Sequence, residues 1–258
     1  MLNRQNDVLL QTRKAKGNIL KNKFNIEFVS ALQPVLEPRT KFGGQPNWIV
    51  RAEWPLSRMH GIPLRFICQI RMDDVSAEEA YKGKMAYLFM SDEELLYNGT
   101  LYGVYQSFDP EGGENAVILQ PGKDRIVQTS SLANGPSLLP KQADRWSLEE
   151  REACDERVEY GVILTEDEEV DCVNQDVLFE LTDAERRTYY ESTGGNKLGG
   201  SPCFIQQEEF PFSPDKSQLV LQLDQSKVPF HVEFGDTGVG YLFIEKGGDR
   251  GRLLWQCG

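Results

Sequence analysis

The stretch Lys41-Phe42-Gly43-Gly44-Gln45-Pro46 has a close copy 156 residues later, Lys197-Leu198-Gly199-Gly200-Ser201-Pro202. Each copy leads to an aromatic-proline pair, Trp54-Pro55 or Phe210-Pro211, and then to two short apolar runs. These blocks follow in the same order at nearly constant offset, which indicates an internal repeat. The sequence therefore predicts two related halves, residues 38–110 and 194–258, within a single domain that spans residues 1–258.

The apolar runs are typical of strands. Phe66–Ile70, Met85–Met90, Leu219–Leu223 and Tyr241–Ile244 are rich in β-branched and aromatic residues, and Gly, Pro and Asn lie between such runs. The intervening segments are too short for a regular alternation of strands and helices. We expect a mainly β, mostly antiparallel roll-like or sandwich-like fold with a few short helices.

The paired glycines are expected to be structural. Gly43, Gly44, Gly199 and Gly200 suit positions with positive φ or close backbone approach, at the junction of the two halves. Replacing Gly44 or Gly200 by valine should therefore lower stability by more than about 1 kcal/mol.

The middle, residues 111–193, carries most of the charge. The chain has a net charge of −12 over 258 residues, and Asp144–Arg187 alone has sixteen acids and five bases. Ser147 and Thr182 are expected to begin helices. Val158–Leu164 is expected to be a strand, followed by an acidic loop at Thr165–Asp171.

This acidic middle has two interpretations: a solvated connector or a partner-binding face. The candidate partner-binding residues are Glu149, Glu150, Glu152, Glu156, Glu166, Asp167, Glu168, Glu169 and Asp171.

Composition excludes several classes of protein. An acidic chain does not attract phosphate backbones through its overall field, so direct nucleic-acid binding is not expected. The five cysteines are scattered without a C-x-x-C pair, which argues against a disulfide framework or a zinc ribbon and fits a reducing cytoplasm. The sequence has no signal-peptide pattern and no apolar run long enough to cross a membrane.

No motif in the sequence indicates a catalytic, metal or cofactor site. Gly194–Ser201 has P-loop-like spacing, but Gly200 stands where the phosphate-binding lysine belongs. Asp236-Thr237-Gly238 matches the aspartic-protease triplet but has no second copy, and that chemistry requires two carboxylates. Only His60 and His231 are available as histidine bases, and no G-x-S-x-G elbow exists. We predict no cofactor and no metal.

Both repeats resemble a known family. The runs Lys197–Gln206, Leu219–Asp224 and Phe234–Gly240 closely resemble the YwqG-like family (DUF1963, a domain of unknown function). Its members carry K-[IL]-G-G-x-P-x-[FY]-x-Q, L-L-Q-[IL]-D and W-G-D-[ST]-G-V-G. The first half is similar to the family's first half through Lys41–Pro46, Trp54-Pro55 and Gly61–Ile70. Phe234 replaces the usual tryptophan, and Cys68 stands where alanine is common.

The resemblance implies a mainly β fold in bacterial cytoplasmic proteins without established catalytic residues. Genes of this family lie near polymorphic toxin loci, which by association suggests an immunity protein that occludes the active cleft of a basic toxin domain. The alternative is an enzyme or small-ligand binder that uses a cleft between the halves, lined by Gln69, Gln222 and Asp236. The two glutamines could instead only satisfy backbone groups in the core.

Overall fold

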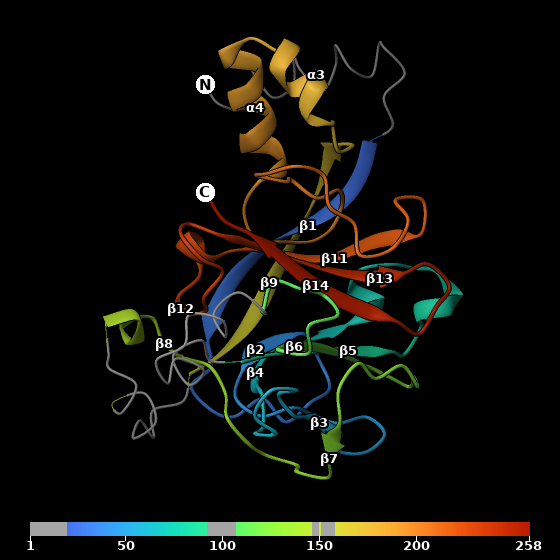
Figure 1. The fold of residues 1–258 in the computed structure, drawn as a ribbon, viewed down its shortest axis with the longest axis vertical. Coiled ribbons are helices and arrows are strands. Elements are labelled where there is room, and N and C mark those ends of the chain that lie inside the picture. Colours follow the sequence, from blue (N-terminus) through green and yellow to red (C-terminus); the bar gives the residue numbers. More distant parts are fainter. Residues whose placement is uncertain (1–19, 92–106, 146–149, 151–157) are drawn as a thin grey trace.

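A ten-stranded antiparallel sheet dominates the protein, whose computed structural model describes residues 20–91, 107–145, 150 and 158–258 (Figure 1). The strand order is β14-β13-β11-β10-β1-β9-β2-β4-β5-β6. Two further two-stranded sheets pair β12 with β8 and β3 with β7. The strands are β1 (Leu20–Ser30), β2 (Lys41–Gly43), β3 (Trp54–Pro55), β4 (Arg65–Arg71), β5 (Met85–Met90), β6 (Asn115–Gln120), β7 (Thr129–Ser130), β8 (Leu139–Pro140), β9 (Glu159–Val170), β10 (Lys197–Gly199), β11 (Ser217–Asp224), β12 (Phe230–His231), β13 (Val239–Glu245) and β14 (Gly251–Gln256).

The predicted fold class is confirmed, because the chain is mainly β and its named strands pair antiparallel. Strands such as β5 and β6 are buried along their whole length. Side chains alternate between the two faces of a strand, so these strands are covered on both faces. This explains why they read as continuous apolar runs rather than as an alternating pattern.

The sheet curls until its two end strands meet. The Asn115 side chain on β6 donates to the main-chain oxygen of Leu253 on β14 at 3.2 Å. A Cβ added at Gly251 on β14 would lie only 3.0 Å from Cβ of Val117 on β6. The largest hydrophobic cluster draws on both halves and includes Phe42 and Leu242. Closure into a near-barrel protects both edges of the sheet from pairing with other chains.

Strand order is symmetric about the central pair β1 and β9. On one side lie β10, β11, β13 and β14, and on the other lie β2, β4, β5 and β6. Lys41 is paired opposite Gln69 just as Lys197 is paired opposite Gln222. These equivalent positions agree with the two predicted halves. Their origin by duplication stays a prediction.

The outer face of each half holds an equivalent aromatic cluster. Trp48 stacks on Phe89 with ring centroids 6.0 Å apart, and Phe204 stacks on Phe243 at 6.4 Å. In both halves the aromatic residue of the aromatic-proline pair completes the cluster: Trp54 meets Phe89 edge-on, and Phe210 meets Phe243 the same way. The loop that follows each Gly-Gly pair therefore packs its aromatic residues onto its own half of the sheet.

The acidic loop predicted at Thr165–Asp171 is wrong. Strand β9 continues to Val170 and pairs with β1 over eleven positions, from Leu20↔Val170 to Ser30↔Tyr160. The local sequence is rich in acids and gives little strand signal. The conformation of β9 is set instead by β1, which pairs with β9 from Leu20 to Ser30.

Two short α-helices follow β9. Helix α3 spans Gln175–Glu180 and helix α4 spans Asp183–Thr193. Thr182 caps α4 in a full capping box with Glu185, which confirms the predicted helix start. The start predicted at Ser147 lies outside the described residues. Among the described residues, no helix has the length and apolarity needed to cross a membrane. The 3-10 helices are η1 (Met72–Asp74), η2 (Glu79–Tyr81), η4 (Lys141–Arg145) and η5 (Gln225–Lys227).

Candidate functional site

The second Lys-x-Gly-Gly motif surrounds a buried ion pair. The Lys197 ammonium lies 2.7 and 2.6 Å from the two carboxylate oxygens of Glu169, and both side chains are fully buried. It also donates to the main-chain oxygens of Thr193 and Ser201. Burial lowers the pKa of Lys197, and the charge and hydrogen bonds of Glu169 oppose that shift. A second ammonium, that of Lys23, lies 3.5 Å from the same carboxylate.

The first motif repeats this arrangement in a less buried form. The Lys41 ammonium lies 2.6 Å from Glu159 and donates to the main-chain oxygen of Val35. Here the glutamate side chain retains 11% exposure. Burial is again the main cause that lowers the pKa of Lys41, against the effect of Glu159. Strand β9 thus supplies both carboxylates, one to each half.

The second glycine of each motif makes room for the carboxylate. Gly44 and Gly200 have φ values of +64° and +73°, in the left-handed region. A Cβ at Gly44 would lie 2.5 Å from Oε2 of Glu159, and one at Gly200 would lie 3.0 Å from Cδ of Glu169 and overlap its Oε1 atom. The preceding glycines, Gly43 and Gly199, also have positive φ. The four glycines are therefore structural in this fold.

Gln69 and Gln222 hold the loops that follow the Gly-Gly pairs. Gln69 accepts from the Asn47 amide at 2.8 Å and donates to the main-chain oxygen of Arg39. Gln222 accepts from the Cys203 amide at 2.8 Å and donates to the main-chain oxygen of Thr193.

The neighbouring strand adds a tyrosine to each network. The hydroxyl of Tyr87 donates to the main-chain oxygen of Asn47, and that of Tyr241 donates to the main-chain oxygen of Cys203. Burial raises the pKa of both phenols. The two glutamines thus lie in two separate interior networks, bonded largely to backbone groups. Asp236 is exposed in the turn before β13 and shares no hydrogen bond with either glutamine.

The structure separates the predicted acidic residues into different environments. Glu166, Asp167 and Glu168 are exposed on β9, and Glu150 is also exposed. Glu169, in contrast, is fully buried against Lys197, so it presents no charge to a partner. Glu149, Glu152 and Glu156 lie outside the described residues.

Asp171 is half-buried at the end of β9. It pairs with Lys21 at 2.7 Å and accepts from the Ser201 hydroxyl at 2.6 Å. Burial favours a higher pKa, but the contacts with Lys21 and Ser201 outweigh it and lower the pKa of Asp171. This carboxylate therefore belongs to the second Gly-Gly loop as much as to the molecular surface.

Helices α3 and α4 add exposed aromatic residues to the acidic surface. Figure 1 shows both helices beyond the sheet, beside the ends of β1 and β9. Phe179 is 77% exposed and Tyr190 is 41% exposed. Phe179 was not among the residues predicted from the sequence, although Asp176 and Glu180 flank it at three residues and one residue in the same short helix. The acidic cap is defined here as the exposed residues Glu166, Asp167, Glu168, Asp176, Phe179, Glu180, Asp183 and Tyr190.

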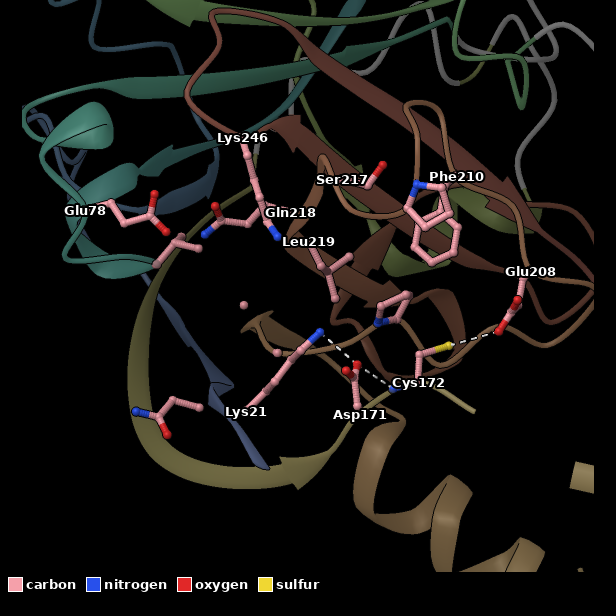
Figure 2. A pocket seen from close by; sticks show the side chains of 16 residues that line it. Lys21, Glu78, Asp171, Cys172, Glu208, Phe210, Ser217, Gln218, Leu219 and Lys246 are labelled. Carbon is pink, nitrogen blue, oxygen red and sulfur yellow. Dashed lines mark hydrogen bonds and ion pairs between the residues drawn. The ribbon is translucent and has the colours of Figure 1, made fainter. Parts of the chain in front are cut away.

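A pocket of about 700 Å³ lies beside the second Gly-Gly loop (Figure 2). Its walls include Gly199 and Gly200, the Phe210 ring and the first residues of β11. Val75 and Glu78 of the first half close it from the other side, so the pocket lies between the halves. Its lining contains neither Gln69, Gln222 nor Asp236.

The pocket carries charges of both signs. Lys21 and Lys246 contribute ammonium groups, while Glu78, Asp171 and Glu208 contribute carboxylates. Burial is the main cause that raises the pKa of the Cys172 thiol, on the pocket wall, to about 12. Within the described part of the chain, no three His, Cys, Asp or Glu side chains are grouped to hold a metal ion.

Comparison with known families identifies the chain. The model of the family described as "Domain of unknown function (DUF1963)" matches residues 40–248. The chain belongs to this DUF1963 family. The matched region contains both Lys-x-Gly-Gly motifs, both aromatic-proline pairs and the whole acidic cap. No curated protein matches the chain.

Proposed function

We propose that this DUF1963 protein is a non-enzymatic binding protein that recognises a basic protein partner through its acidic cap. The most concrete form of this proposal is a cytoplasmic immunity protein that occludes the active cleft of a bacterial polymorphic toxin. The observation that carries it is the exposed Phe179 ring on helix α3, which also presents the exposed carboxylates of Asp176 and Glu180.

This combination supports protein binding for two physical reasons. Aromatic side chains that become buried in an interface contribute much of its affinity, and an exposed phenylalanine can serve as such an anchor. Surrounding carboxylates attract a basic surface from a distance and raise the association rate. Clefts that act on nucleic acids or nucleotides tend to be basic, so such a toxin domain is a matching partner.

The alternative function is a small-ligand binder or enzyme that uses a cleft between the halves. The pocket of about 700 Å³ between segment 75–78 and the second Gly-Gly loop supports this alternative. Its size falls within the usual range for small-molecule sites, roughly 300–1,000 Å³. Gln69, Gln222 and Asp236 do not line it, so the residues that would contact a ligand differ from those predicted.

The decisive experiment measures association with the toxin domain encoded beside the gene. Reversing Glu166, Asp167 and Glu168 to lysine should slow association at least about tenfold at about 50 mM salt and weaken its salt dependence. The matched control reverses Glu37, Glu79 and Asp215, which are exposed acids outside the acidic cap, and has the same net charge. An equal effect in both variants would refute a specific role for the cap.

The aromatic anchor is tested separately through dissociation. Phe179→Ala should raise the dissociation rate about 30-fold, the equivalent of about 2 kcal/mol for an interface hot spot. Its side chain is exposed, so the unfolding midpoint should stay close to that of the wild type. Unchanged dissociation together with full protection of cells would exclude α3 from the interface.

A further inference from the structure

The outer face of the first half is covered by a segment of the chain itself. Within residues 129–137, Ser130 pairs with Trp54, and Ser137 forms a parallel bridge with Phe66. The Phe66 amide donates to the main-chain oxygen of Pro136 at 2.9 Å. This segment, the covering segment, thus adds an extended chain along the edge of β4 where β2 has ended.

Side chains of the first half hold the covering segment in place. The Gln45 amide group bonds both main-chain groups of Gly135, at 3.0 and 2.8 Å. Gly135 lies against the Trp54 ring, so that an added Cβ would approach the ring to 2.8 Å. The Arg65 guanidinium donates to the main-chain oxygen of Ser137. Residues at the start of β4 therefore bind backbone groups of an extended peptide.

The second half has the same edge at β11. Gln218 is paired opposite Ile244 as Arg65 is opposite Met90. Leu219 faces Phe243 as Phe66 faces Phe89, and both strands have a register shift immediately afterwards. The counterparts of Arg65, Phe66 and Trp54 are thus Gln218, Leu219 and Phe210, and all three line the pocket of about 700 Å³. The place filled by the covering segment in the first half is hollow in the second.

Gln218 supplies independent evidence that the hollow takes a ligand. Its Oε1 atom is buried and has no hydrogen-bond partner among the described residues. Figure 2 shows the Lys246 side chain extending into the hollow, the Gln218 amide turned toward the Glu78 side, and Lys21 directed at Asp171. A buried acceptor without a donor is costly, and the penalty would be removed if the Gln218 amide turned toward a ligand N–H in the pocket. In the first half, the equivalent Arg65 donates to the main-chain oxygen of Ser137 in the covering segment.

We propose that this pocket binds an extended peptide segment of a partner protein, parallel to β11 along its open edge. The main chain of the peptide would pair at Leu219, as Pro136 and Ser137 pair at Phe66. One of its N–H groups would bond Gln218 Oε1 after the amide turns toward the pocket. A small residue followed by proline would lie on the Phe210 ring, as Gly135-Pro136 lies beside Trp54. Strand addition of this kind draws its affinity from main-chain hydrogen bonds. The inference goes beyond the acidic cap and does not depend on it.

The test titrates isotope-labelled protein with a capped peptide of the covering sequence, Ser131 to Leu138, and with a scrambled peptide of the same composition. Binding should shift the amide signals of 199–201 and 217–219 saturably, and only with the ordered sequence. Gln218→Arg introduces the residue found at the equivalent position of the first half, Arg65, whose charged guanidinium donates to a main-chain oxygen. We expect it to tighten binding about tenfold. The control Lys82→Ala, on an exposed side chain, should leave affinity unchanged.

Three results would overturn the proposal. Equal binding of the scrambled peptide would show that binding does not depend on the order of residues in the peptide, which contradicts specific pairing along β11. Shifts confined to Trp54 and Phe66 would mean that the peptide exchanges with the covering segment instead of entering the pocket. Shifts at 217–219 with a mixture of free amino acids and nucleotides, but none with the peptide, would favour a small ligand. If Gln218→Arg fails to fold, Gln218→Ala serves in its place and should lower the affinity.

Discussion

Gly200→Ala tests the idea that the second Gly-Gly loop exists to seat a buried carboxylate. The variant adds one methyl group at a position whose φ is +73°. Left-handed backbone costs a residue with a Cβ about 1–2 kcal/mol. Gly195→Ala is the matched control, because Gly195 has a φ of +84° and open space where its Cβ would lie. The free energy of unfolding of the control should therefore fall only by this backbone cost of about 1–2 kcal/mol.

The second contribution at Gly200 comes from Glu169. The added Cβ would lie 3.0 Å from the carboxyl carbon, while ordinary contact begins near 3.4 Å, and it would overlap Oε1. That oxygen accepts from Lys197 at 2.7 Å and from the Ser201 amide at 2.6 Å. Moving it disrupts a fully buried ion pair, and disruption of such a pair costs about 3–5 kcal/mol. The expected total loss for Gly200→Ala is therefore about 4–7 kcal/mol.

Urea unfolding followed by circular dichroism measures the difference. With a slope of about 3 kcal/mol/M, the Gly200 variant should lower the midpoint by more than about 1 M, and the Gly195 variant by about 0.5 M. Equal midpoints for the two variants would refute the argument, because the carboxylate would then have moved without cost.

Three further predictions concern individual side chains. Lys197→Met should destabilise the protein by about 3–5 kcal/mol, because it removes the Lys197 ammonium from the fully buried Glu169 carboxylate. Lys41→Met should destabilise it clearly less, because the carboxylate beside Lys41 is partly exposed. The urea midpoints of both variants would show which one loses more stability. The lowered pKa of Asp171 means that its pairing stabilises the fold above the ordinary value of 3.8 and is lost as the pH falls below it. Asp171→Asn should thus cost less than about 1 kcal/mol at neutral pH, since the pair is half exposed, and an equal cost at pH 7 and in acid would contradict this. Burial raises the pKa of the Cys172 thiol to about 12, so its alkylation rate by iodoacetamide should still rise about tenfold per pH unit past pH 9. An ordinary thiol should instead reach a plateau there. Peptide mass spectrometry of native and denatured protein would measure the alkylation rate.

The sequence alone determined the strands that are apolar on both faces. Continuous runs such as Met85–Met90 and Tyr241–Ile244 carry their own signal, because both faces of these strands are buried. The repeated Gly-Gly pairs also indicated positive φ, since few other residues adopt it without strain. Thr182 and Glu185 fixed a helix start because both partners of a capping box lie within one turn.

Only the tertiary structure decided the roles of the acidic residues. Glu166 to Glu169 look alike in sequence, yet Glu169 is buried on Lys197 while its neighbours are exposed. The difference arises because β1 pairs with β9 on one side and with β10 on the other, which brings Glu169 beside Lys197, 28 residues away. No local pattern encodes this contact. The pocket likewise depends on distant segments, since Val75 of one half and Phe210 of the other meet only after the sheet has closed. Local chemistry therefore set the strands and turns, and long-range pairing set which side chains became core, surface or pocket wall.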